Sequence, residues 1–126
     1  MQRILSISYD KALLHTRAMM LSAAGFEVES AVGFSAAIHA CEKGAFDLVI
    51  MGHSIPVEDK EAIIKQLKAV CATPILALRR PNELPVKDAE YNLDSAEPGR
   101  FLRYVREITH HNTHSTSRME YDAEEA

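Results

Sequence analysis

The feature that most constrains the fold is the alternation of short apolar runs with longer amphipathic segments. The clearest run, FDLVIM at residues 46–51, is nearly continuous in apolar side chains, as expected of a parallel strand that is buried on both faces. Strands that alternate with helices at this spacing indicate βαβ units, and therefore an α/β fold with a parallel sheet. The predicted strands are residues 2–8, 26–31, 46–51, 73–78 and 90–93, and the predicted helices are residues 11–24, 35–43, 58–69 and 97–109.

Residues suited to helix ends support these boundaries. Asp10 is placed to cap the first helix, and Gly25 suits the left-handed backbone position that often ends a helix. Ser35 is predicted to cap the second helix, which ends at Gly44. Met19 falls on the apolar spacing of the first helix and is assigned to the core.

One interval is too short for a regular crossover. Only 11 residues, RRPNELPVKDA, separate Leu78 from Glu90, whereas a crossover between parallel strands usually needs roughly a dozen or more. Pro81 and Pro85 fall within this interval, and proline is excluded from helix interiors. The last two strands are therefore predicted to be joined by a loop or a turn, with the intervening helix lost.

Length and charge limit the organisation and the partners. A chain of 126 residues suits one domain; we expect it to cover residues 1–110, and the polar, acidic residues 111–126 to form a disordered tail. The net charge of −4 is the opposite of the basic face that binds nucleic acid. No apolar run approaches the roughly 18 residues that span a bilayer. We therefore expect no nucleic-acid partner and no membrane partner.

The two cysteines are predicted to be reduced thiols. Cys41 and Cys71 lie far apart in the sequence and show no metal-ligand spacing. Buried, unpaired thiols are typical of cytosolic proteins, and the N-terminus lacks the features of a secretion signal. These observations predict a cytoplasmic location.

The carboxyl ends of the predicted strands are where a site is expected. In an open parallel sheet, ligands bind outside these ends, near the point where the strand order reverses. Apart from one glycine, the residues at these ends carry hydroxyl, carboxylate, imidazole or guanidinium groups. These residues are Ser8, Tyr9 and Asp10 after the first strand, Gly52, His53 and Ser54 after the third, Arg79 and Arg80 after the fourth, and Asp94 and Ser95 after the fifth.

The order of elements and the stretch AGFEVESAVGFSAAIHACEKGAFDLVIMGHSIP resemble the receiver domain of two-component response regulators. The resemblance covers about residues 2–108 and is strongest over residues 25–31, 34–40 and 47–56. It implies a flavodoxin-like fold, a three-layer sandwich around a five-stranded parallel sheet of order 2-1-3-4-5. It also implies a role in bacterial phosphorelay signal transduction.

The resemblance fails at the residue that accepts the phosphoryl group. Receivers carry this aspartate at the end of the third strand, in a run similar to DLVLLDxxMP. The corresponding run here is DLVIMGHSIP at residues 47–56, which puts Gly52 at the acceptor position. Because glycine has no side chain to act as a nucleophile, an acyl phosphate cannot form there.

The other positions of the receiver site are also substituted. The acidic pair that holds Mg²⁺ after the first strand corresponds to Ser8 and Tyr9, which leaves Asp10 as the nearby carboxylate. The hydroxyl residue that ends the fourth strand corresponds to Arg79, and the lysine that ends the fifth corresponds to Asp94. The resemblance therefore implies a degenerate receiver, or pseudo-receiver, with no catalytic residue, no bound metal and no cofactor.

Arg79 is open to two interpretations. Its guanidinium can enter the vacated site and pair with Asp10 or Asp94, which would do permanently what metal and phosphate do transiently in an active receiver. An exposed pair of this kind would contribute only about 0–1 kcal/mol, so it would bias the conformation more than it would add stability. Alternatively, Arg79 and Arg80 simply point into solvent.

The histidines offer weaker candidates. His53 or Ser54 could replace the missing nucleophile, but a loop histidine is more often solvated and no base–orienter pair flanks it in the sequence. His110, His111 and His114 have a spacing that only weakly indicates zinc, with no cysteine nearby. Neither group changes the expectation of a chain without a metal.

Three functions are compatible with these residues. The favoured one is a non-enzymatic signalling module that binds a protein partner, such as a sensor kinase, a regulator or an output protein, or associates with itself. The second is a sensor of a small anion or nucleotide, which Ser54, Arg79 and Arg80 would bind. The third, a divergent enzyme, has no supporting motif such as a glycine-rich phosphate loop.

Overall fold

The computed structural model describes residues 2–94 and 98–113. The chain divides into two compact units after residue 95, and each unit is described by itself. The second unit contains α4 (Pro98–Thr113). The first contains β1 (Arg3–Ser8), α1 (Lys11–Ala23), β2 (Glu27–Val32), α2 (Gly33–Lys43), β3 (Leu48–Met51), α3 (Val57–Val70), β4 (Ile75–Arg79) and β5 (Tyr91–Asp94).

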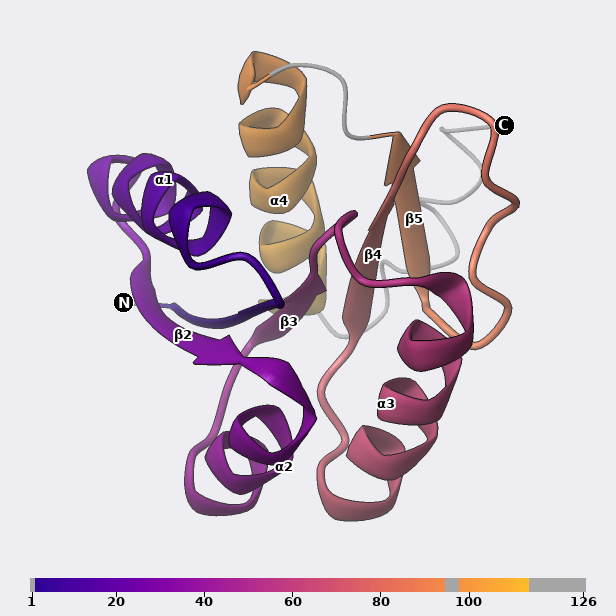
Figure 1. Ribbon diagram of the computed structural model, residues 1–126. Helices are drawn as coiled ribbons and strands as arrows, with labels where there is room; N and C mark the ends of the chain where they lie inside the picture. Colours follow the sequence, from indigo (N-terminus) through magenta and orange to yellow (C-terminus); the bar gives the residue numbers. More distant parts are fainter. Residues whose placement is uncertain (1, 95–97, 114–126) are drawn as a thin grey trace. The chain divides into compact units, whose positions relative to one another are not determined.

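The strands form one five-stranded sheet in the order β2-β1-β3-β4-β5, and every pair is parallel. α1 lies on one face of the sheet, and α2 and α3 lie on the other, so the first unit has three layers (Figure 1). The register places Met51 of β3 opposite Ile7 of β1 and Ala77 of β4. This is the predicted flavodoxin-like fold with the predicted strand order.

The central strands are buried on both faces, as the apolar runs predict. All of β3, Leu48–Met51, is inaccessible to solvent. On the face that α2 and α3 cover, Ile63, Ile64 and Leu67 pack into one core cluster with the strands. Their spacing along α3 puts them on one side of the helix, which is why this helix docks on the sheet.

Both ends of α1 are predicted correctly, and so is the end of α2 at Gly44, but the start of α2 is not. The Asp10 side chain caps α1, and Gly25 has a positive φ of 99°, a conformation that glycine adopts without strain. α2 begins earlier than predicted, at Gly33 (φ 86°), so Ser35 lies inside the helix and does not cap it. Met19 is 60% exposed and is not part of the core, because the buried side of α1 is set by other positions.

The predicted loss of the helix between β4 and β5 is confirmed. Val86 of the loop between them is 1% exposed and belongs to the core cluster. The Asn92 side chain then holds the loop beside β5: its Oδ1 accepts from Val86 N–H at 2.7 Å and its Nδ2 donates to Val86 O at 3.2 Å. A buried valine and an amide pair therefore hold the loop between β4 and β5.

The prediction of two reduced thiols is wrong. Cys41 and Cys71 form a disulfide across a sequence separation of 30 residues, with their Cα atoms 6.1 Å apart. Cys41 lies near the end of α2, and Cys71 caps the end of α3. Because both helices lie on the same face of the sheet, the fold brings together two cysteines whose separation in the sequence gave no sign of it.

The described part of the second unit, residues 98–113, is one amphipathic helix. Phe101, Val105 and Ile108 recur along α4 at the spacing of a single face. The helix ends at Thr113, so it continues into the predicted tail, the rest of which lies outside the described residues. No helix among the described residues is long and apolar enough to cross a membrane.

Candidate functional site

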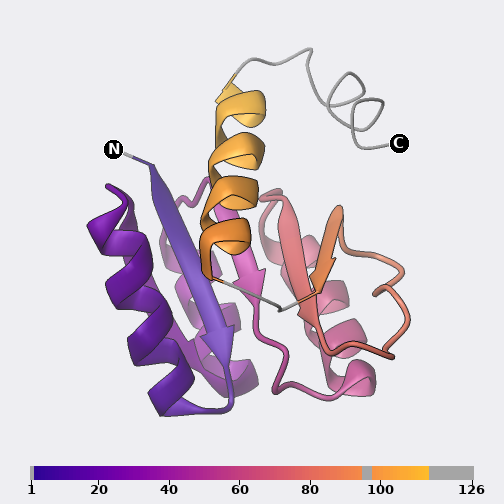
Figure 2. The same ribbon diagram turned by 90° about the horizontal axis from the view of Figure 1, so that it is seen from above.

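Direct hydrogen bonds join the loops that follow β1 and β3. The strands point the same way, so these loops meet at one edge of the sheet (Figure 2). The hydroxyl oxygens of Ser8 and Ser54 lie 2.8 Å apart, and Ser8 Oγ also accepts from the N–H of Asp10 at 3.1 Å. A direct hydrogen bond between protein groups thus connects the two loops.

A second hydrogen bond joins the residue after β1 to α3. The Tyr9 hydroxyl donates to Asp59 Oδ2 at 2.8 Å, which connects the end of β1 to the first turn of α3. Burial, the hydrogen bond to Asp59 and its negative charge all raise the pKa of Tyr9, so the phenol stays protonated and remains the donor.

Asp10 is occupied as a helix cap. Its Oδ1 accepts from the N–H groups of Ala12 at 2.9 Å and Leu13 at 3.2 Å. The carboxylate therefore satisfies the first turn of α1. Among residues 2–94 and 98–113, no three His, Cys, Asp or Glu side chains are grouped so as to hold a metal ion. His111 and His114, two of the histidines considered as zinc ligands, have no described side chain.

Gly52 follows the last residue of β3, and an arginine from α1 reaches it. The N–H of Gly52 donates to Ile7 O at 2.9 Å, which fixes its place beside β1. A Cβ atom added there would lie 3.2 Å from Ile7 O, 3.3 Å from Ser8 Cβ and 3.3 Å from Nη1 of Arg17. Arg17 itself is only 6% exposed. A guanidinium therefore lies directly beside the residue that corresponds to the phosphoryl acceptor.

A second buried cation lies under the end of β4. Lys60 of α3 is completely buried, and its Nζ donates to Leu78 O at 2.9 Å and to Glu83 Oε1 at 3.2 Å. Burial alone would raise the pKa of Glu83. The hydrogen bonds from the Arg80 N–H and from Lys60, and the positive charges of both residues, have the larger effect, so the pKa of Glu83 is lowered overall. The Lys60–Glu83 ion pair therefore connects the 80–90 loop to α3.

Arg79 pairs with Asp94, which is one of its two predicted partners. Its Nη1 lies 3.1 Å from Asp94 Oδ1 and donates to Glu83 O at 2.9 Å. The end of β4 is thereby tied both to the end of β5 and to the loop between them. Arg80 is exposed, and its N–H donates to Glu83 Oε1 at 3.1 Å. Ser95 lies outside the described residues.

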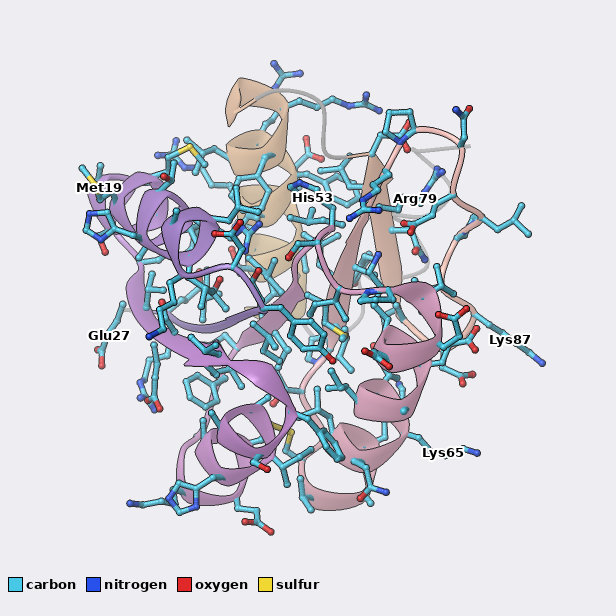
Figure 3. The ribbon with its side chains drawn as sticks, viewed as in Figure 1. Met19, Glu27, His53, Lys65, Arg79 and Lys87 are labelled. Carbon is cyan, nitrogen blue, oxygen red and sulfur yellow. A yellow bond between two sulfur atoms is a disulfide. The ribbon has the colours of Figure 1, made fainter. Side chains whose placement is uncertain are left out.

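His53 lies among these cations, near the end of β3 (Figure 3). Its Nδ1 atom is buried and has no hydrogen-bond partner among the described residues. Burial lowers the pKa of His53, and the positive charges of Arg17, Arg80 and Lys60 lower it further, against a smaller opposing effect of Glu83. The imidazole is therefore neutral at pH 7.

This lowered pKa predicts a loss of stability in mild acid that depends on His53. Below the unfolded-state pKa of about 6.5, the unfolded chain binds a proton that the folded chain resists, so stability falls as the pH falls from there. Urea unfolding of His53→Asn between pH 7 and about pH 5 should show a shallower loss than the wild type. The exposed His39→Asn variant is the control and should follow the wild type; parallel curves for all three proteins would contradict the lowered pKa.

Sequence reasoning missed Arg17, Lys60 and Glu83. Arg17 falls on the buried side of α1 with Leu14 and Leu21, and Lys60 precedes the apolar positions of α3 by helical spacing. A charged residue at a core position of an amphipathic helix is the signal that could have found both. Glu83 lies in an irregular loop, and no pattern marks it.

Solved structures of receiver domains match this chain, whereas no protein-family profile and no curated protein sequence does. A CheY-like response regulator receiver domain from Methylobacillus flagellatus matches with a TM-score of 0.74 at 20% identity, over 86% of this chain and 98% of that one. The chain has the receiver fold.

Two further structures agree. The chemotaxis protein CheY4 of Vibrio cholerae matches with a TM-score of 0.67 at 24% identity, over 86% of this chain and 98% of that one. A structure of a histidine kinase in complex with a response regulator protein matches with a TM-score of 0.67 at 20% identity, over the same shares. Within this receiver fold, the carboxyl edge of the sheet holds Gly52, Arg17 and Lys60.

Proposed function

We propose that the chain is a non-phosphorylatable, receiver-like signalling module that acts by binding a protein of a two-component pathway. The observation that carries this proposal is Gly52. It occupies the position after β3 where receivers keep their acceptor aspartate, and the Arg17 guanidinium lies beside it. Without a carboxylate there is no group to take up the phosphoryl transferred by a kinase.

The contacts around Gly52 support a site fixed in one state. In the receivers that this chain resembles, Mg²⁺ and a phosphoryl group connect the strand ends transiently. Here the Ser8–Ser54 hydrogen bond connects the loops after β1 and β3, and the Tyr9–Asp59 hydrogen bond connects the end of β1 to α3. The Arg79–Asp94 ion pair connects β4 and β5.

The proposed interaction surface is the 80–90 loop. Leu84 within it is 82% exposed. The residue before it, Glu83, is hydrogen-bonded to Lys60, and Val86, two residues after it, is hydrogen-bonded to Asn92. A rigidly displayed apolar side chain is suited to enter a pocket of a partner protein. A histidine kinase is the proposed class of partner, since a kinase–regulator complex is among the similar structures; another regulator, an output protein or a second copy of this chain are the alternatives.

Absence of enzymatic activity and a cytoplasmic location are part of the same proposal. Both rest on the receiver resemblance. The cysteines no longer support a cytoplasmic location, because Cys41 and Cys71 form a disulfide and disulfides are uncommon in reducing compartments.

Chemical phosphorylation tests the proposal. We expect acetyl phosphate with Mg²⁺ to leave the intact mass unchanged, while an active receiver in the same reaction gains one phosphoryl group. An adduct on the wild type would contradict the proposal, and His53→Asn would locate it: an adduct lost in this variant lies on His53, and an adduct retained lies elsewhere.

The alternative function, sensing of a small anion, is favoured by one observation. The cations Arg17, Lys60 and Arg80 all act electrostatically on His53 at the sheet edge, against the single carboxylate of Glu83. The two functions are compatible, because a module that is never phosphorylated can still respond to a ligand.

A further inference from the structure

Arg17 is a buried cation without a carboxylate partner in the described part of the chain. The side chain is 6% exposed. Within residues 2–94 and 98–113, its guanidinium makes one long hydrogen bond, from Nη1 to Ser6 Oγ at 3.4 Å, and no ion pair. Because a guanidinium keeps its charge at neutral pH, burial without a counter-ion is costly. A bound anion would relieve that cost.

The groups beside Arg17 suit an anion. Its Nη1 lies 3.3 Å from the point where a Gly52 side chain would begin. The Ser8 and Ser54 hydroxyls lie at the same strand ends, and the next residue after Gly52 is His53, whose buried Nδ1 has no partner among the described residues. Hydroxyl groups can donate hydrogen bonds, and so can the one ring nitrogen of a neutral imidazole that carries the proton.

The charged groups beside Gly52 are positive, whereas the groups that bind a metal ion are negative. Lys60 lies close by but is already paired with Glu83, and Asp10 is turned to its own helix. No carboxylate among the described residues forms an ion pair with Arg17. A cation ligand is disfavoured here, and an anion is favoured.

We propose that Arg17 and His53 form the centre of a non-covalent binding site for a phosphate group, beside Gly52 at the end of β3. The inference rests on the proposed function in one respect, that no acceptor carboxylate stands at Gly52. The guanidinium would bind two phosphate oxygens in parallel, and the neutral His53 imidazole would donate to a third in the tautomer that carries its proton on Nδ1. Free inorganic phosphate and the phosphate of a nucleotide share this chemistry.

Thermal unfolding with and without inorganic phosphate, at matched pH and ionic strength in chloride, tests the site. We expect phosphate to raise the Tm of the wild type by several degrees at saturation, and Arg17→Met to lose this response. In phosphate-free buffer Arg17→Met should unfold at or above the wild-type Tm, because the substitution removes an uncompensated charge. The exposed Arg100→Met variant is the control and should keep the response.

Gly52→Asp and Gly52→Ala form a second, matched pair. Both add a Cβ atom in the same tight space, but only aspartate supplies an internal counter-ion to Arg17. We expect Gly52→Asp to have a higher Tm than Gly52→Ala in phosphate-free buffer and to bind phosphate at least about tenfold more weakly than Gly52→Ala does.

The outcomes separate the sources of the phosphate and the two proposals. A nucleoside monophosphate that stabilises the wild type more than inorganic phosphate would identify a nucleotide as the ligand, and equal effects would identify the free ion. No Tm shift with either, or the same shift in Arg17→Met as in the wild type, would overturn the site. Were Arg17→Met not to fold, isothermal titration of phosphate into the wild type, Gly52→Asp and Gly52→Ala would decide in its place. A covalent adduct detected by mass would instead contradict the proposed function.

Discussion

The Lys60→Met variant is expected to lose about 3 kcal/mol of stability, because the substitution removes one partner of a buried ion pair. The Lys60 side chain is completely buried, and its Nζ binds both Leu78 O and Glu83. Methionine fills nearly the same space but donates no hydrogen bond. The Leu78 carbonyl and the Glu83 carboxylate are then left without the ammonium group. Urea unfolding followed by circular dichroism measures the loss.

The same helix provides the control. Lys65 is exposed on the outer side of α3 (Figure 3), so Lys65→Met should change stability by less than about 0.5 kcal/mol. Glu83→Gln completes a double-mutant cycle, in which we expect a coupling of about 1–3 kcal/mol between Lys60 and Glu83. If Lys60→Met were as stable as Lys65→Met, the buried pair would not be what holds the loop.

Reduction of the disulfide is expected to cost about 3 kcal/mol. Cys41 and Cys71 close a loop of 30 residues, and a crosslink over this length restricts the unfolded chain by roughly that free energy. The urea midpoint of the wild type should therefore fall when a reducing agent is added, and the far-ultraviolet spectrum below the transition should stay that of the folded protein.

A variant without either thiol isolates this effect. The double substitution Cys41→Ala and Cys71→Ala should unfold at the same urea concentration with and without reductant, close to the reduced wild type. Thiol titration of the unfolded, unreduced wild type should detect no free cysteine. A wild-type midpoint that does not respond to reductant would show that the two residues are not joined in solution.

The sheet and its helices could be predicted from the sequence because their signal is local. The run at β3 is apolar at every position, and helical spacing in α3 puts Ile63, Ile64 and Leu67 on one side. The absence of a helix between β4 and β5 could also be predicted from the local sequence, because two prolines in a short interval exclude it. Periodicity and turn residues depend on neighbours along the chain, so they can be recognised without knowledge of the tertiary structure.

The site residues could be predicted only in part, because their partners come from distant segments. Gly52, His53 and Arg79 could be predicted as site residues because they follow strands, and the carboxyl ends of parallel strands share one edge of the sheet. Arg17 was missed because α1 was given the wrong buried side, with the exposed Met19 in place of Arg17. The disulfide was missed for a similar reason: the layer that α2 and α3 share is a property of the fold.

The substitutions at the carboxyl edge together describe a change of chemistry. Active receivers gather carboxylates there to hold Mg²⁺. This chain gathers Arg17, Lys60 and Arg79 there, two of them paired with Glu83 or Asp94. In the proposed function direct protein contacts take the place of the metal, and the remaining positive charge is the basis for the proposed phosphate site.

The central claim is that this edge is held by protein contacts and not by a metal ion. A titration of the ¹⁵N-labelled protein with magnesium chloride, followed by amide spectra, tests it most directly, with sodium chloride of equal ionic strength as the control. The account predicts that the amide signals of Ser8, Asp10, Gly52 and His53 do not respond to Mg²⁺ beyond the change seen with sodium. Saturable shifts confined to these residues would show a metal site at the strand ends and would contradict the account.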